Sequence, residues 1–364
     1  MKILDKLTMS VVPFKSAIRS LFILNVDYSV KRVWNYIIVF LSMSLSKLLK
    51  KQILWGYPPI LMVEPTNICN LKCPMCPSGN GDMARPRGKL DLINFTQVMD
   101  DIGDYIYQVQ FWNQGEPFIN KSFLDMVRYA KAKGVMTQTS TNGHFIRTDT
   151  MAEEVVASGL DQIIFSMDGT NQETYEKYRI GGNYKLVIET LGRLSKAREK
   201  LKSKIPLIEL QFLVFKHNRA EIDTLIELAK SHKVNRIAFK SAQVYSDEQA
   251  AQYLPDEGEL NRYNYDGRSF KLKWEVQNWC KRLWLNSTIN WDGTVSPCCF
   301  DKDAKYAFGN IFDKHTTFND IWRNQKYIAF RRSVMKNRKS IPMCGNCTEG
   351  MKEPYVRIVE IDDL

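Results

Sequence analysis

The chain has 364 residues, of which 44% are hydrophobic and 25% are charged, and its formal net charge is +11. This composition is ordinary for a globular protein, and the length allows two domains or one large domain with an appendage. Eight cysteines are too few, in a chain this long, for a secreted scaffold held together by disulfides.

The positive charge is concentrated in the first 55 residues. This arm carries nine Lys and Arg residues and two Asp, so its net charge is +7 and only +4 is left for the other 309 residues. Its first twenty residues lack the compact apolar core and the small-residue cleavage site of a signal peptide. We therefore expect the protein in a reducing, cytoplasmic compartment.

A stretch of fourteen residues without a charge, 33–46, lies within this arm. It is shorter than the roughly twenty apolar residues that span a membrane. Helical spacing places Asn35, Ser42 and Ser46 on one side and the apolar residues on the other: Trp34, Ile37, Ile38, Leu41, Leu45, Leu48 and Leu49. With flanking Lys and Arg, this pattern fits a helix lying in the plane of an anionic membrane on its cytoplasmic face. The alternative is a helix docked on the protein body or on a second subunit. Nucleic acid is not expected as a partner, because the apolar side has no use there.

Beyond the arm, strand-like and helix-like patterns alternate from residue 60 to residue 245. The predicted strands cover residues 60–64, 107–112, 135–139, 162–166, 207–214 and 236–239. The predicted helices cover residues 93–104, 121–133, 149–158, 183–202 and 219–232. Alternation of this kind predicts parallel βαβ units, and six units make an incomplete α/β barrel.

Three cysteines follow the first predicted strand: Cys69, Cys73 and Cys76, with the spacing C-x3-C-x2-C. Three thiolates this close can converge on one metal centre, and a 4Fe–4S cluster with only three Cys ligands keeps one iron open. Structural zinc requires four closed ligands, and the nearest histidine is the distant His144. A disulfide would leave one of the three cysteines over.

This loop resembles the signature of the radical S-adenosylmethionine (SAM) superfamily. The resemblance implies a partial (β/α)6 TIM-like barrel in which the amine and carboxylate of SAM chelate the open iron of the 4Fe–4S cluster. It also implies that an electron cleaves SAM to a 5′-deoxyadenosyl radical, which abstracts a hydrogen from the substrate. The electron donor would be of the flavodoxin or ferredoxin type.

In parallel barrels the chemistry gathers at the carboxyl ends of the strands. Gly115, Glu116 and Pro117 follow the second predicted strand and resemble the Gly-Glu-Pro motif that contacts the amino group of SAM. The resemblance makes Glu116 the partner of the SAM ammonium, and Gly115 permits a close backbone approach.

The next two strands are also followed by polar residues. Ser140 and Asn142 follow the third strand, where the family contacts the ribose of SAM, although an ordinary Asn-Gly turn is the alternative. Ser166 follows the fourth strand as a polar contact to SAM, and Asp168 is alternatively a cap of the next helix. Arg179 resembles a position that pairs with the SAM carboxylate; the alternative is a solvated surface arginine.

The other five cysteines lie beyond residue 279. Cys280, Cys298, Cys344 and Cys347 form the pattern C-x12-G-x4-C followed by C-x2-C, which resembles the SPASM extension with its auxiliary iron–sulfur clusters. Four thiolates permit one fully ligated auxiliary 4Fe–4S cluster, and Cys299 is spare or replaces Cys298. A tight hairpin over 290–295 would bring Cys298 back toward Cys280. A zinc site with the same ligands is the alternative.

Together these patterns predict a radical SAM oxidoreductase or maturase with an unidentified substrate. The expected units are a basic helical arm (1–55), the partial barrel (56–245), a linker (246–274), the auxiliary cluster domain (275–350) and a tail (351–364). A peptide-modifying maturase is one alternative. A non-catalytic zinc-binding scaffold with a membrane-docking arm is another.

Overall fold

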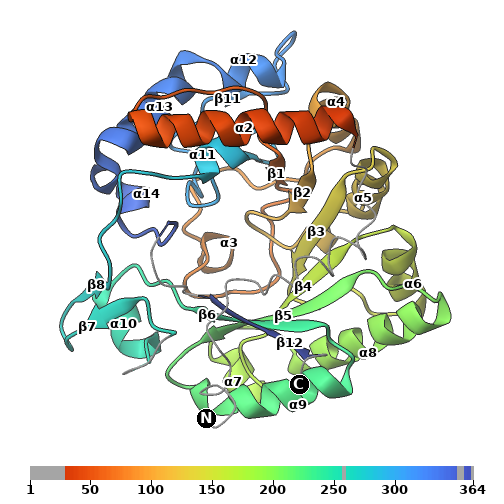
Figure 1. The fold of residues 1–364 in the computed structure, drawn as a ribbon. Coiled ribbons are helices and arrows are strands. Elements are labelled where there is room, and N and C mark those ends of the chain that lie inside the picture. Colours follow the sequence, from red (N-terminus) through yellow and green to blue (C-terminus); the bar gives the residue numbers. More distant parts are fainter. Residues whose placement is uncertain (1–28, 256–259, 351–355, 362–364) are drawn as a thin grey trace.

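The computed structural model describes residues 29–255, 260–350 and 356–361 (Figure 1). Most of the basic arm, residues 1–28, lies outside the described residues, as do parts of the predicted linker and tail.

Six parallel strands form the centre of the molecule and follow one another in chain order across the sheet. They are β1 (Ile60–Val63), β2 (Gln108–Phe111), β3 (Met136–Thr141), β4 (Gln162–Ser166), β5 (Leu207–Val214) and β6 (Arg236–Ser241). The helices between them are α4 (Leu92–Ile102), α5 (Phe123–Ala132), α6 (Asp149–Ala157), α8 (Tyr184–Lys200) and α9 (Ile222–Ser231). The predicted (β/α)6 partial barrel is confirmed, with differences of one to three residues at most boundaries.

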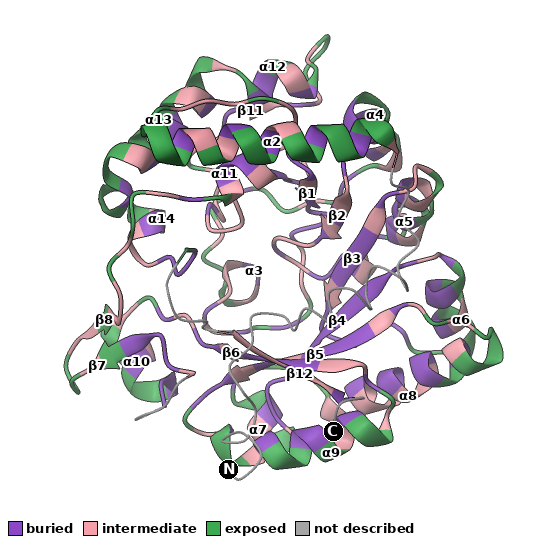
Figure 2. Ribbon diagram, viewed as in Figure 1, coloured by how far each residue is buried: buried purple, intermediate pink, exposed green. Residues whose placement is uncertain are grey.

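The helices cover the outside of the sheet because each has one apolar side (Figure 2). Helix α4 is typical: the side chain of Asp91 accepts a hydrogen bond from the backbone of Ile93 and so caps the helix, which then buries Phe95, Val98 and Met99. Short elements connect the units or follow the strands: α3 (Pro77–Asn80), η2 (Pro117–Ile119), α7 (Gln172–Glu176) and η3 (Arg219–Glu221).

Both edges of the six-stranded sheet are extended by segments from the C-terminal third of the chain. Strand β9 (Asn286–Ile289) pairs in parallel with β1, and β12 (Val356–Glu360) pairs antiparallel with β6, within one ten-stranded sheet. The sequence predicts no strand beyond β6 and only a tail at 351–364, so neither added strand was expected. Open strand edges carry unpaired backbone donors and acceptors, which these two strands satisfy.

Residues 246–274 differ from the expected linker. They contain α10 (Asp247–Tyr253) and a two-stranded hairpin, β7 (Tyr263–Tyr265) with β8 (Phe270–Leu272). Tyr253 and Tyr263 are buried in a small apolar cluster that includes Leu71 and Cys73 of the cysteine loop. The segment therefore supports the cysteine loop instead of merely joining two domains.

The C-terminal region packs onto the barrel near β1. Its remaining elements are α11 (Arg282–Leu285), β10 (Thr294–Ser296), β11 (Gly309–Asn310), α12 (Phe318–Trp322), α13 (Gln325–Asn337), η4 (Arg338–Ser340) and α14 (Pro342–Gly345). Strands β9 and β10 form the predicted hairpin. The fully buried indoles of Trp284 and Trp322 donate hydrogen bonds to the carbonyls of Ile53 and Gly56, which precede β1. These contacts join the C-terminal region and the barrel in one core.

Helix α2 (Val30–Leu49) confirms the helix predicted in the arm. It is docked on the barrel: the guanidinium of Arg32 donates to the carbonyls of Gly103 and Ile106, and the amide of Asn35 donates to those of Tyr57 and Tyr105. Among the described residues, no helix is long and apolar enough to cross a membrane.

Candidate functional site

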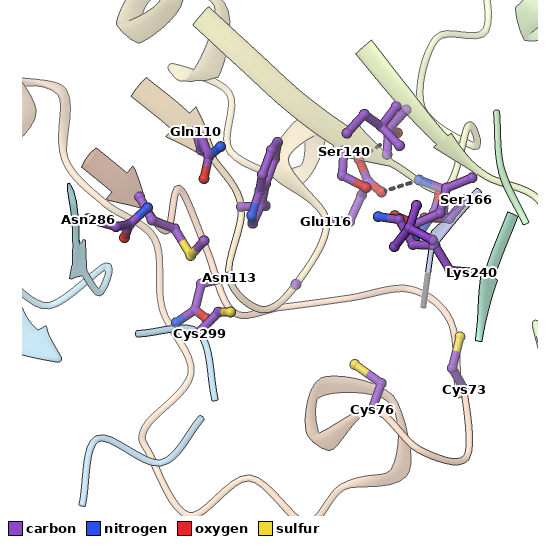
Figure 3. A pocket seen from close by; sticks show the side chains of 18 of the residues that line it. Cys73, Cys76, Gln110, Asn113, Glu116, Ser140, Ser166, Lys240, Asn286 and Cys299 are labelled. Atoms are coloured by element: carbon purple, nitrogen blue, oxygen red, sulfur yellow. Dashed lines mark hydrogen bonds between the residues drawn. The ribbon is translucent and has the colours of Figure 1, made fainter. Parts of the chain in front are cut away.

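A cavity of about 890 Å³ opens inside the barrel, between the strands and the C-terminal region (Figure 3). Nine of the residues predicted from the sequence line it: Cys69, Cys73, Cys76, Gly115, Glu116, Ser140, Asn142, Ser166 and Arg179. Pro117 does not line it; this residue is buried and begins η2 directly behind Glu116. Residues from five separate segments of the chain are thus brought to one space.

The cysteine loop leaves the carboxyl end of β1 and folds tightly on itself. The backbone of Cys76 donates to the carbonyl of Cys73 at 3.1 Å, and a side chain at Gly79 would place its Cβ only 2.6 Å from the nitrogen of Cys73. Polar groups approach the sulfurs from other elements. The guanidinium of Arg179 lies 3.7 Å from the Cys73 sulfur, and the amide of Asn142 lies 3.9 Å from that of Cys69.

The three thiols suit an iron–sulfur cluster by their chemistry and their shared exposure to the cavity. Burial raises the pKa of Cys69 to about 11 and also raises that of Cys73, and the charges of neighbouring thiols add to both effects. Such thiols are converted to thiolates by binding a metal, which replaces the proton. Among the described residues, no three His, Cys, Asp or Glu side chains are arranged around a position for a single metal ion.

Glu116 is fixed behind the cysteine loop. Its carboxylate accepts hydrogen bonds from the Thr141 hydroxyl at 2.8 Å and from the backbone of Asn142 at 2.7 Å, and its own backbone donates to Ile68 at 2.9 Å. Burial raises the pKa of Glu116 to about 7, although these hydrogen bonds oppose the effect. A buried carboxylate with an elevated pKa is suited to receive a cation.

Gly115 allows this close packing. Its φ is +76°, and a Cβ there would lie 2.4 Å from the carbonyl oxygen of Thr66. Only glycine accepts both the left-handed backbone and the contact. The backbone N–H of Gly115 also donates a hydrogen bond to the hydroxyl oxygen of Ser78 at 3.1 Å.

Arg179 is not a solvated surface residue. Its guanidinium forms an ion pair with Asp168 at 2.6 Å, lines the cavity and faces Cys73. Burial alone would lower the pKa of Arg179, but the charges of Asp168 and Cys73 outweigh this effect and raise the pKa well above its usual value. Asp168 does not cap the next helix, because the side chain of Asn171 does so for α7. Asp168 instead accepts from the backbone of Leu213 and holds Arg179 in place.

The other predicted polar residues have mixed surroundings. Asn142 donates to the side chain of Asn70 at 2.7 Å, and its backbone contact with Glu116 makes it more than an ordinary turn residue. Ser140, within β3, and Ser166, at the end of β4, both line the cavity. Their hydroxyls can serve as donors or acceptors for a ligand.

Several cavity residues were missed by the sequence analysis: Gln110, Trp112, Asn113, Gln211, Lys240 and Asn286. Polar residues at every second position of a predicted strand, as at Gln108 and Gln110, were the available signal. Lys240 has the side-chain oxygen of Gln211 as a partner and, within the described residues, no carboxylate at ion-pair distance. Burial lowers its pKa.

The second cysteine set surrounds a buried arginine. The charges of Cys280, Cys344 and Cys347 all raise the pKa of Arg338, against the opposing effect of burial, so these thiols lie near its guanidinium. Burial raises the pKa of Cys298, and Cys299, Cys280 and Cys347 add to that shift. Cys299 differs from the other four because it lines the large cavity.

Comparisons with known proteins agree with this arrangement. Residues 63–229 match the model of the radical SAM superfamily, and residues 280–348 match SPASM, an iron–sulfur cluster-binding domain. The first match runs from the last residue of β1 into α9 and includes the cysteine loop. The second begins at Cys280 and ends one residue after Cys347.

Two named relatives match most of the chain. A tungsten-containing aldehyde ferredoxin oxidoreductase cofactor-modifying protein of Pyrococcus furiosus is 27% identical over 83% of this chain and 90% of its own length. The mycofactocin maturase MftC of Mycolicibacterium smegmatis is 26% identical over 80% of this chain and 75% of its own.

Solved structures share the fold. SuiB of Streptococcus suis bound to S-adenosylmethionine has a TM-score of 0.58 at 16% identity and covers 91% of this chain and 76% of its own. BtrN in complex with AdoMet and 2-DOIA has a TM-score of 0.51 at 17% identity, over 84% of this chain and 99% of its own.

The chain is a radical SAM enzyme with a C-terminal SPASM domain. A 4Fe–4S cluster, SAM and an auxiliary iron–sulfur cluster are its cofactors. Among its relatives are enzymes named as maturases and as cofactor-modifying proteins.

Proposed function

We propose that Cys69, Cys73 and Cys76 ligate the 4Fe–4S cluster that binds SAM. The observation that carries this proposal is the convergence of the three thiols, Glu116 and Arg179 on one cavity. When bound, the cluster held by these cysteines would supply the one-electron reduction that cleaves SAM and so allows a hydrogen atom to be taken from the substrate.

The residues around the loop would hold SAM by its charges. Glu116 would receive the ammonium, because its carboxylate is buried behind the loop, and Arg179 would donate to the carboxylate from beside Cys73. Asp168 orients Arg179 and so acts as a positioning residue. The remaining proposed contacts are the backbone at Gly115 and Pro117 and the polar side chains of Ser140, Asn142 and Ser166.

We further propose Cys280, Cys298, Cys344 and Cys347 as the ligands of one auxiliary 4Fe–4S cluster. Cys280, Cys344 and Cys347 lie near Arg338, and Cys298 lies near Cys280 and Cys347, which supports this set. The position of Cys299 on the cavity favours it as the spare cysteine. Arg282 lies beside Cys299 and pairs with Glu349 at 2.7 Å, so this wall of the cavity is charged and ordered.

When bound, the auxiliary cluster held by these cysteines would supply a one-electron acceptor for the substrate. Together with the hydrogen atom already removed and a proton released to water, this electron would complete the loss of two hydrogens. The result would be a dehydrogenation or the closure of a crosslink, each a two-electron oxidation. The position of Cys299 supports this electron-accepting role. Cys299 lines the cavity and is the chain neighbour of Cys298, so the proposed cluster ligand lies next to the cavity wall.

The cavity favours a polar substrate with an anionic group. Gln110, Gln211 and Asn286 offer amides to it, and Lys240 offers a half-buried cation whose hydrogen-bond partner is neutral. By contrast, Arg179 and Arg282 both have carboxylate partners. The charge of Glu209 acts on Lys240 without an ion pair between them, and a substrate anion would supply a direct counter-charge.

The substrate can be sought without knowing its identity. Reduced enzyme and SAM are incubated with extract from cells grown in heavy water, and the mass of the released 5′-deoxyadenosine reports direct deuterium transfer from a substrate. We expect the active fraction to be retained by an anion-exchange resin. We expect Lys240→Met to lose the deuterium transfer while it still cleaves SAM. A protease-sensitive fraction would favour the peptide-modifying alternative.

The wider assignments are also proposals. A flavodoxin or ferredoxin type donor would reduce the cluster, and a cytoplasmic location with peripheral membrane contact fits eight free cysteines and the basic arm. The proposed units are the arm (1–55), the barrel (56–245) and the auxiliary cluster domain (275–350). The helix and hairpin within 246–274 and strand β12 within 351–364 belong with the barrel, because they pack on it.

Anaerobic purification distinguishes this enzyme from a zinc-binding scaffold. We expect a brown protein with about eight irons per chain, from two 4Fe–4S clusters, that releases 5′-deoxyadenosine when reduced with SAM. A colourless protein loaded with zinc and inert toward SAM would contradict the proposal.

A further inference from the structure

Helix α2 lies on the outside of the molecule and much of its length is exposed (Figure 2). Nine of the fifteen exposed large apolar side chains among the described residues lie on this one helix. They are Val30, Val33, Trp34, Tyr36, Ile37, Phe40, Leu41, Leu48 and Leu49. A concentration of this kind on a folded protein indicates a site of interaction, whereas single exposed apolar residues do not.

This helix packs on the protein through its polar side, the reverse of the usual arrangement. An amphipathic helix normally turns its apolar side to the core. In α2 the buried side is largely polar: Arg32, Asn35, Ser42 and Ser46 are buried against the protein, with Val39 as their apolar neighbour. The Ser46 hydroxyl even forms hydrogen bonds to both backbone groups of Ile53. The fold therefore uses the polar side, and none of residues 29–255, 260–350 and 356–361 buries the apolar side.

The outward surface has the arrangement of an interfacial helix. Val30, Ile37, Leu41 and Leu48 are spaced by seven, four and seven residues and so share one side of the helix. The exposed side chain of Lys47 stands near its C-terminal end, and Lys50 and Lys51 follow directly, whereas Lys31 at the other end pairs with Asp104 at 2.9 Å. The helix contains no acidic residue, and the arm as a whole has a net charge of +7. Lysines around an apolar surface are complementary to anionic headgroups over acyl chains.

We propose that the apolar surface of α2, defined by the nine residues above, docks in the plane of an anionic bilayer. This inference deepens the proposed membrane contact and does not depend on the radical chemistry. It commits to a lipid surface because the basic residues complement anionic lipid, whereas on a second copy of this surface they would face like charge.

The proposal also fixes the orientation of the enzyme. Helix α2 bonds to Tyr57, Tyr105 and Ile106, which precede β1 and β2, so it lies at the amino ends of these strands. The cysteine loop follows the carboxyl end of β1. A bilayer against α2 therefore leaves the cysteine loop pointing away from the lipid, toward a substrate and an electron donor that approach from water.

The test is sedimentation of the full-length, cluster-loaded protein with vesicles. Vesicles of phosphatidylglycerol and phosphatidylethanolamine are compared with vesicles of phosphatidylcholine alone. We expect binding to the anionic vesicles that weakens with added salt. We expect Ile37→Ser/Leu41→Ser to reduce the fraction bound by at least about tenfold. Ile37→Glu/Leu41→Glu should reduce it further.

Ile93→Glu/Met151→Glu is the matched control, because it adds the same charge at two exposed apolar residues outside α2. This variant should bind vesicles nearly as well as the wild type. Iron content and SAM cleavage should be unchanged in every variant, which shows that the fold is intact. A wild type that does not bind anionic vesicles overturns the proposal. Vesicle binding that survives in Ile37→Ser/Leu41→Ser also overturns it, as does a dimer that this variant dissociates in solution without lipid.

Discussion

The two cysteine sites of this protein differ in what they face. Cys69, Cys73 and Cys76 all line the cavity, whereas of the second set only Cys299 does. The first site is bordered by groups that suit the charges of a ligand, Glu116 and Arg179. In the second site, Cys280, Cys344 and Cys347 lie near Arg338 and do not line the cavity. Under the proposed ligation, the difference teaches that the cluster that binds SAM is exposed to the cavity, while the auxiliary cluster lies beside it.

The largest expected effect is loss of the cavity-facing cluster. We expect Cys73→Ala to abolish reductive SAM cleavage, because three thiolates are the minimum set for a cluster that also binds SAM. The measurement is anaerobic release of 5′-deoxyadenosine with a chemical reductant. Cys299→Ser is the matched control and should retain cleavage. If Cys299→Ser loses cleavage as well, the two sites do not have the separate roles proposed here.

Disruption of the second site should have a different consequence. We expect Cys344→Ala to lower the iron content by about half, from about eight to about four per chain. SAM cleavage should persist. Deuterium should still be transferred from the substrate to 5′-deoxyadenosine, but the oxidised product should not form. Iron analysis and the heavy-water assay measure the two properties. Full substrate oxidation by Cys344→Ala would show that the auxiliary cluster is structural.

Glu116 tests how the first site recognises its ligand. We expect Glu116→Gln to weaken SAM binding by about tenfold to 100-fold, because a buried charge-assisted contact is replaced by a neutral one. Equilibrium dialysis of the cluster-loaded protein measures the dissociation constant. The exposed Glu173→Gln, on α7, is a control with the same chemical change and should bind SAM normally. Unchanged affinity in Glu116→Gln would remove Glu116 from the site.

The smallest expected effect is a pH dependence of SAM binding. The pKa of Glu116 is raised to about 7 by burial, so its carboxyl is protonated below pH 7 and cannot pair with an ammonium. Bound SAM favours the ionised form, and binding therefore releases a proton. Affinity should rise with pH up to about 7 and fall by up to about tenfold per pH unit below it. Glu116→Gln should flatten this profile between pH 5.5 and 7; an unflattened profile would assign the titration to another group.

Local patterns were sufficient for much of the barrel. Strands β4 and β5 lie where they were predicted, because predominantly apolar runs separated by helical patterns encode parallel units. The cysteine loop and Glu116 could be predicted because their spacing places them directly after strands. Lys240 could not be recognised in this way, because it lies one residue beyond the strand predicted at 236–239 and only the structure extends β6 to include it.

The amino-acid sequence by itself determined the cofactor chemistry, because ligand type and spacing within a short loop are local properties. It also determined the order of the strands and the amphipathic pattern of α2. Only the tertiary structure decided that α2 packs through its polar side, that Asp168 holds Arg179, and that β9 and β12 extend the sheet. These outcomes depend on which distant groups satisfy a buried charge or an open strand edge, and such partners are chosen when the whole chain packs.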